Sequence, residues 1–197
     1  MALRNHFLSA ILLTGLSITP QISASKTTTY TNKTYNFAFN YPSTYHLKTF
    51  GDGYFDLLNN SKIVLRASIE DAAFKIFIKE NNPTADIFHS FARQRCKIVC
   101  AADGPDGSTY CDEIESEREY ISANGLRFLE FYLVMTRENY SDKTKKKSRV
   151  GPVYVVNLSM GNRHLALIIY PGYGALASES AKSLAQGVIE SVRLLQS

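Results

Sequence analysis

Pairs of apolar runs joined by very short polar turns dominate this chain, and they restrict the folds that it can adopt. Strands linked by tight hairpins are antiparallel, because a parallel pair needs a crossover of about a dozen residues or more. Asn-Gly, which occurs between two such runs, is the preferred chemistry of a hairpin turn. Three hairpins are expected: 54–58 with 62–70 about Asn59-Asn60-Ser61, 111–122 with 126–138 about Ala123-Asn124-Gly125, and 153–160 with 164–170 about Gly161-Asn162.

A further strand and two helices complete the pattern. Aromatic residues alternate with smaller or polar ones from Tyr35 to Tyr41 and are followed by Pro42, which predicts a half-buried strand. Helices are predicted from Pro83-Thr84 to about Cys96 and over residues 178–195, because both stretches carry apolar residues at helical spacing. Residues 73–79 are compatible with one more short strand. A mainly antiparallel sheet with helices packed on it is an α+β fold.

The first 24 residues have the pattern of a secretory signal peptide. Arg4 precedes an apolar stretch from Phe7 to Ile18, and Ala24 offers a small residue at the expected cleavage position. The stretch is shorter than the roughly 20 residues that span a bilayer, and no later segment is long and apolar enough. We therefore expect an exported protein, periplasmic or extracellular, that is not an integral membrane protein. Residues 25–32 are expected as a flexible N-terminus and residues 33–197 as a single globular domain.

The charge of the chain is only mildly basic, at +4. Nucleic acid is not an expected partner, because it would call for a clustered basic face. One basic run does stand out in residues 140–149, which read as a polar loop: Lys143, Lys145, Lys146, Lys147 and Arg149. Either this run is a solvated loop, or it contacts an anionic partner such as phospholipid headgroups or an acidic protein surface.

Three cysteines, Cys96, Cys100 and Cys111, lie close together in the sequence. A hairpin about Pro105-Asp106 would pair Cys100 with Cys111, at a cross-strand separation of about 4.5–5.5 Å that a disulfide tolerates. Cys96 would then be a free thiol. A Cys96–Cys111 bridge and three unpaired thiols remain open alternatives. We expect no metal, because no His accompanies the cysteines.

Evidence for catalysis is weak in this sequence. No nucleophile elbow, no metalloprotease motif and no phosphate-binding Gly loop occurs, and no cofactor is expected. A nucleophile at Cys96, activated by Arg93 or Arg95, is conceivable but lacks an identifiable base. Four alternating carboxylates follow Cys111, and they are expected on one strand face, either simply solvated or binding a cation: Glu113, Glu115, Glu117 and Glu119.

Two stretches of the chain together resemble PsbP-like domains. The first is an aromatic strand, Tyr35 to Tyr45, that runs through Tyr41-Pro42. The second is the amphipathic helix that runs into Ile189-Glu190-Ser191-Val192-Arg193-Leu194, and the Asn124-Gly125 hairpin lies where such domains carry one. The family includes the extrinsic photosystem II subunit and many exported bacterial proteins of unknown function. Over most of residues 33–195, the resemblance implies a three-layer α-β-α sandwich and a binding or assembly role, with no catalytic residue.

The leading hypothesis is an exported, non-enzymatic binding or assembly module of the cell envelope. Its partner would be an envelope protein or an anionic surface. The alternative is a small exported hydrolase or thiol-dependent enzyme that uses Cys96 or one of the histidines. An enzyme of this kind needs a nucleophile and a base within hydrogen-bond reach.

Overall fold

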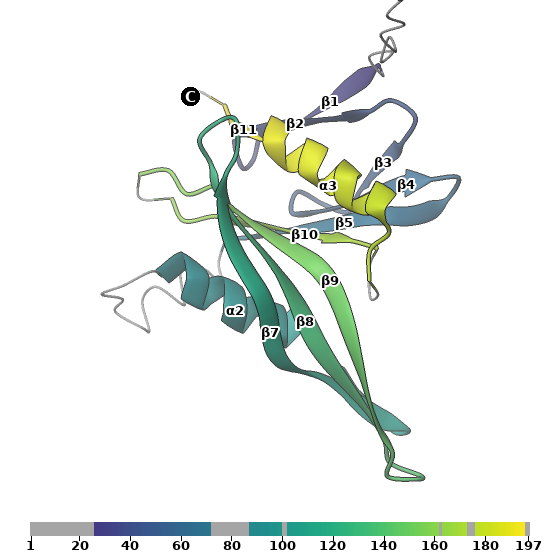
Figure 1. Cartoon of the computed structure of the whole chain (residues 1–197). Helices are drawn as coiled ribbons and strands as arrows, with labels where there is room; N and C mark the ends of the chain where they lie inside the picture. Colours follow the sequence, from purple (N-terminus) through teal and green to yellow (C-terminus); the bar gives the residue numbers. More distant parts are fainter. Residues whose placement is uncertain (1–25, 72–86, 100–101, 162, 173–175, 196–197) are drawn as a thin grey trace, which may run out of the picture.

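The fold is known from a computed structural model that describes residues 26–71, 87–99, 102–161, 163–172 and 176–195. Within these residues, eight strands form one antiparallel sheet and three shorter strands form a second (Figure 1). The large sheet has the order β3 (His46–Thr49), β4 (Tyr54–Asn59), β5 (Lys62–Glu70), β10 (Ala166–Pro171), β9 (Lys145–Asn157), β8 (Arg127–Asn139), β7 (Gly107–Ile121) and β6 (Ala102–Gly104). The small sheet has the order β1 (Thr27–Asn32), β2 (Phe37–Pro42) and β11 (Arg193–Leu194).

One helix covers each face of the large sheet. Side chains alternate along its strands, so Phe128 packs in the core cluster of α3 (Glu179–Ser191), while Leu129 packs in that of α2 (Ile87–Val99). Phe37 and Phe39 of β2 join the α3 side. The expected antiparallel sheet with helices packed on it is confirmed, although the sheet dominates and the described residues contain only these two helices. None of the described helices is long and apolar enough to cross a membrane.

Most of the predicted elements are present. β4 and β5 form the first hairpin, β7 and β8 form the Asn-Gly hairpin, and β9 and β10 are antiparallel neighbours. The first helix continues past Cys96 to Val99, whereas its predicted start and the possible strand 73–79 lie outside the described residues. The last helix ends at Ser191 rather than at residue 195. Val192 is extended, and the next two residues pair with β2 as β11.

Residues 27–32 are not a loose N-terminus, as the sequence suggested, but form β1. This strand pairs with β2 along its whole length, from Thr27 opposite Pro42 to Asn32 opposite Phe37. Its threonines face solvent, so it lacks the apolar alternation that marks a half-buried strand. Backbone pairing with β2 holds the strand in place, together with Tyr30, which packs against the α3-side core, and the buried Asn32.

The prediction of a polar loop over residues 140–149 is also wrong. Only residues 140–144 form the connection, and β9 begins at Lys145. The first five residues of β9 are all exposed, so no apolar pattern reveals them as a strand. Their partner is β8, which pairs Glu138 with Lys145 and Val134 with Arg149.

β7, β8 and β9 extend past both helices as a bent arm (Figure 1). We call residues 103–115 and 132–150 the arm. Register shifts interrupt the ladders where the arm leaves the body, in β7 between Glu115 and Arg118 and in the β8–β9 pair between Phe131 and Leu133. Such bulges bend strands and increase their twist. The bulge in β7 contains Ser116 in a left-handed conformation, with φ of 54°.

Candidate functional site

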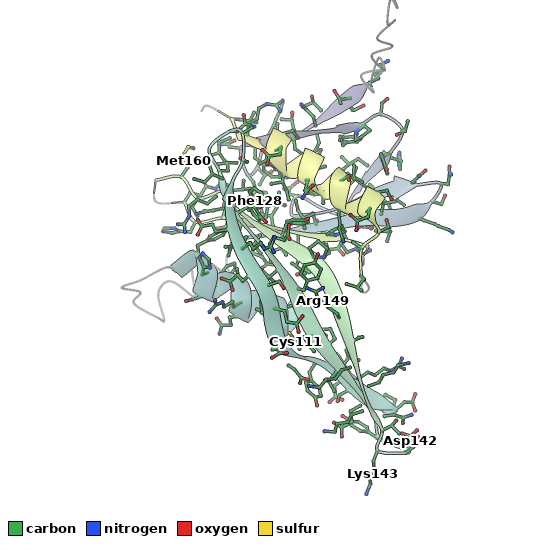
Figure 2. The ribbon with its side chains drawn as sticks, viewed as in Figure 1. Cys111, Phe128, Asp142, Lys143, Arg149 and Met160 are labelled. Carbon is green, nitrogen blue, oxygen red and sulfur yellow. The ribbon has the colours of Figure 1, made fainter. Side chains whose placement is uncertain are left out.

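The five basic residues singled out in the sequence lie on the arm. Lys143 is at its tip, in the turn, and Arg149 lies near its base, close to the body (Figure 2). Lys145, Lys146, Lys147 and Arg149 occupy the exposed part of β9. Because neighbouring strand residues point to opposite faces, Lys146 lies on the other face from Lys145 and Lys147. The strand therefore divides the charges that the sequence presents as one run.

Three of these five cations have carboxylate partners on neighbouring strands. Nζ of Lys145 is 3.3 Å from Oε2 of Glu138, and Nζ of Lys147 is 3.0 Å from Oδ2 of Asp112. Hydrogen bonds to these carboxylates raise the pKa of both lysines. Nε of Arg149 is 3.1 Å from Oε2 of Glu115, and its guanidinium also lies over the ring of Tyr132, at 3.7 Å from the ring centroid.

Arg137, Lys143 and Lys146 form the remaining group of arm cations, which we call the cation trio. Within the described residues, no carboxylate forms an ion pair with any of the three. Arg137 stands directly opposite Lys146 in the β8–β9 register. Like charges in that position destabilise a sheet, so this pair is electrostatically unsatisfied. Sequence reasoning missed Arg137, which could have been found only from the register of the two strands.

A cavity of about 360 Å³ lies beside Arg137, where the β6–β7 hairpin meets β8. Arg137 and Asn139 line one side of it, and Asp103 and Asp106 line the other. Asp103 is already engaged, because its Oδ1 accepts from the Tyr140 hydroxyl at 2.8 Å. The cavity is thus bounded by both signs of charge, and none of its lining residues is aromatic or a large hydrophobic residue, as would be usual in a small-molecule pocket.

The four alternating carboxylates of β7 do not share a face, contrary to the expectation from sequence. The bulge at Ser116 separates them into two pairs. Glu113 and Glu115 stand opposite Val134 and Tyr132, on the α3 side of the sheet. Glu117 and Glu119 contact α2 instead. The bulge therefore excludes a cation site made of all four.

Glu117 and Glu119 belong to an ion network that attaches α2 to the sheet. Nδ1 of His89 contacts Glu117, and its Nε2 is 2.8 Å from Oε2 of Glu119. Nε of Arg93 is 2.5 Å from Glu117, and Nε of Arg127 is 2.5 Å from Glu119. An imidazole donates from both nitrogens only when it is protonated. Carboxylates at both ring nitrogens therefore favour the protonated form of His89, in which neither nitrogen can act as a base.

The two carboxylates have lowered pKa values for slightly different reasons. Hydrogen bonds from Arg127 and then from His89 lower the pKa of Glu119 to about 2. Burial opposes ionisation of Glu117, but hydrogen bonds and charge from Arg93 and His89 outweigh it and leave its pKa lowered as well. Both side chains are therefore ionised at neutral pH, which fits a protonated His89 between them.

The cysteine region is described only in part. The hairpin register is as predicted, with Gly104 opposite Gly107 and Ala102 opposite Thr109. Cys100 lies outside the described residues, as does the side chain of Cys96, so the Cys100–Cys111 bridge and the free thiol at Cys96 stay predictions. Cys111 is half-buried against the α2 core, and its Sγ is 3.3 Å from the carbonyl oxygen of Glu113. Among the described side chains, no group of three or more His, Cys, Asp or Glu residues is placed to hold a metal ion.

Comparison with known proteins gives likenesses in structure. No family model matches the sequence, and no curated protein matches it. The chain is similar to the solution structure of cyanobacterial PsbP (CyanoP) from Synechocystis sp. PCC 6803, with a TM-score of 0.39 and 11% identity over 91% of this chain and 98% of that one. That neighbour belongs to the family that the terminal motifs resemble. A crystal structure from Bacteroides thetaiotaomicron VPI-5482 matches with a TM-score of 0.31 and 15% identity, covering 85% of this chain and 48% of that one.

Proposed function

We propose that this chain is an exported, non-enzymatic binding or assembly module of the cell envelope, built as a PsbP-like α-β-α sandwich. The signal-peptide pattern of residues 1–24 supports export. The placement of α2 and α3 on opposite faces of the sheet supports the three-layer architecture. The engaged nitrogens of His89 disfavour the form of the alternative, a hydrolase or thiol-dependent enzyme, in which this histidine acts as the base.

The outer part of the arm is the observation that carries this proposal. Residues 103–110 and 137–149 contribute no side chain to either core cluster of the described chain. They are nevertheless ordered into paired strands that project from the body (Figure 1). An ordered extension that the core does not need is well suited to contact a partner.

The charges of the arm indicate what kind of partner it fits. Seven acidic and six basic side chains occur on it, so it carries no large excess of either sign. The cation trio is the part that forms no ion pair with a carboxylate of the described chain. We infer that the trio meets anionic groups of an envelope protein, and that a phospholipid surface is the second candidate.

A capture experiment with the mature chain, residues 25–197, tests the proposal. Lys143→Ser with Lys146→Ser removes two charges of the trio, and Lys145→Ser with Lys147→Ser removes two charges that have carboxylate partners. We expect the first double variant to lose a protein that wild type captures from the native envelope, and the second to retain it. If both variants capture the same proteins as wild type, the arm is not the contact surface and the proposal falls.

A further inference from the structure

The outer edge of β9 is open along the arm. β9 pairs with β8 over nearly its whole length, whereas β10 pairs only with residues 154–157 of β9. In the described part of the chain, no strand lies against residues 145–150 on that other side. A row of backbone N–H and C=O groups therefore faces solvent there, as it does at any uncovered edge strand.

The register identifies which backbone groups point outward. The N–H of Asn139 donates to the C=O of Thr144 at 2.9 Å, and residue pairs along an antiparallel ladder alternate between hydrogen-bonded and non-hydrogen-bonded. Lys145, Lys147 and Arg149 therefore turn their N–H and C=O groups away from β8. The same edge already takes one hydrogen bond nearer the body, where the C=O of Gly151 accepts from the N–H of Ala177 at 2.8 Å.

We propose that this open edge, residues 145–149 of β9, binds an extended acidic segment of a partner protein as an added strand. The inference rests on the proposed function and names the kind of partner that the arm would take. In strand addition, main-chain hydrogen bonds supply the affinity and alternate side chains supply the selectivity. Here the main-chain hydrogen bonds would be made by the outward N–H and C=O groups of Lys145, Lys147 and Arg149.

Lys146 and Arg137 of the cation trio provide the selectivity for acidic side chains. Lys146 lies on the face opposite to Lys145 and Lys147, with Arg137 directly across from it on β8. An Asp or Glu of an added strand that stands beside Lys146 would place a negative charge next to two cations that repel each other. Oppositely charged cross-strand neighbours stabilise a sheet, so the acidic segment relieves the repulsion present in the isolated chain.

Other occupants fit the edge less well. Two copies joined through β9 would bring the basic residues of one edge against those of the other, which like-charge repulsion disfavours. A phospholipid surface would meet the trio, but it offers no regular row of donors and acceptors to the backbone. Lysines on an edge strand can also serve only to prevent aggregation, in which case no segment binds.

A synthetic peptide of about six residues that alternates Glu with Val serves as the probe. We expect it to bind the mature chain, with an affinity that falls as salt rises. The same peptide N-methylated at the amides of one edge cannot donate those hydrogen bonds, and we expect it to bind roughly tenfold more weakly or worse. A peptide with Lys in place of Glu should not bind. These measurements use the wild-type protein, so they do not depend on the folding of any variant.

Two variants at position 147 test whether the backbone N–H groups of the protein contribute to peptide binding. Lys147→Pro removes an outward N–H, at an edge position where proline is tolerated. Lys147→Ala removes the same charge and keeps the N–H, so it is the matched control. We expect the proline variant to bind the acidic peptide roughly tenfold more weakly than the alanine variant. Circular dichroism and thermal unfolding check that both variants are folded.

The outcomes separate this inference from the proposed function. Equal binding of the methylated and unmethylated peptides would overturn strand addition, while leaving a charge-dependent contact on the arm. Binding to phosphatidylglycerol vesicles but not to the acidic peptide would also overturn it and would favour the lipid surface. If wild type binds neither probe and the capture experiment shows no dependence on the trio, the inference and the proposed function fail together.

Discussion

His89 shows how a single side chain can attach a helix to a sheet through charge. Its two ring nitrogens contact Glu117 and Glu119 on β7, and Arg93 and Arg127 balance the second oxygens of these carboxylates. Exposed ion pairs each contribute little, about 0–1 kcal/mol, but a network with several shared partners is less easily replaced by water. The sequence presents His89 as an isolated surface histidine, because its partners lie some thirty residues away on another element.

Acid should weaken this attachment. The pKa of Glu119 is lowered from 4.5 to about 2 in the folded chain, mainly by Arg127 and then by His89. A lowered folded-state pKa contributes stability that is present above the unfolded value and is lost as the pH falls through the folded value. We therefore expect the free energy of unfolding to decrease between about pH 4.5 and pH 2, and Glu119→Gln to flatten that decrease. Urea unfolding across this pH range measures the effect.

Glu113→Gln is the matched control for that experiment. Glu113 lies on the same strand as Glu119, but it is exposed and outside the His89 network. We expect its pH profile to follow that of wild type. A Glu119→Gln profile as steep as wild type would mean that the network does not contribute to acid sensitivity.

At the scale of elements, sequence patterns identified the strands that bury side chains and missed those that do not. The β4–β5 and β7–β8 hairpins were predictable because apolar alternation and turn chemistry agree there. β1 exposes its threonines and the first half of β9 exposes nearly every side chain, so both resemble loops in the sequence. Their strand character comes from pairing with a neighbour, which a local sequence pattern does not contain.

The candidate site was predictable in composition but not in arrangement. The basic residues of β9 were evident from the sequence, whereas their partners on β7 and β8 depend on registers that bulges shift. Ser116 is the clearest case, because its left-handed backbone assigns Glu115 and Glu117 to opposite faces of the sheet. The even spacing of the four glutamates in the sequence gives no indication that the strand changes face at Ser116.

Asn124 has a second role beyond the hairpin turn that its sequence predicts. Its Nδ2 donates to the C=O groups of Glu190 at 3.0 Å and Val192 at 2.9 Å, at the C-terminal end of α3. Asp-Gly forms the same turn as Asn-Gly but lacks these donors. We expect Asn124→Asp to destabilise the fold by about 1–2 kcal/mol, through two lost hydrogen bonds and a negative charge at a helix C-terminus. Urea unfolding gives the value.

Asn139→Asp is the matched control for Asn124→Asp. Asn139 uses its Oδ1 oxygen, which accepts from the N–H and hydroxyl of Ser141, and an aspartate retains that acceptor. We expect this variant to differ from wild type by less than about 0.5 kcal/mol. Equal effects of the two substitutions would mean that the cap on α3 is not what Asn124 contributes.

At the scale of the whole molecule, the two ends of the described chain meet in the small sheet, and the arm projects from the body away from it (Figure 1). β1 and β11 both pair with β2, so the first and last described strands belong to one small sheet. That sheet packs with α3 over the face of the large sheet that faces away from α2. The core is therefore complete without the outer arm, which lies at the far end of β7, β8 and β9 (Figure 1).

Shortening the arm should separate binding from folding. Arg137 and Lys146 are direct partners across β8 and β9, so an Asn-Gly turn can join them after removal of residues 138–145. The deleted residues add no side chain to either core cluster, and we expect thermal unfolding to shift by only about 2–4 °C, corresponding to roughly 1 kcal/mol. Capture of the envelope partner should be weakened, because the deletion removes Lys143 of the cation trio and the Lys145 end of the open β9 edge. A shortened chain that no longer folds would instead make the tip of the arm a structural requirement, and one that captures the partner as well as wild type does would show that the contact does not depend on that tip.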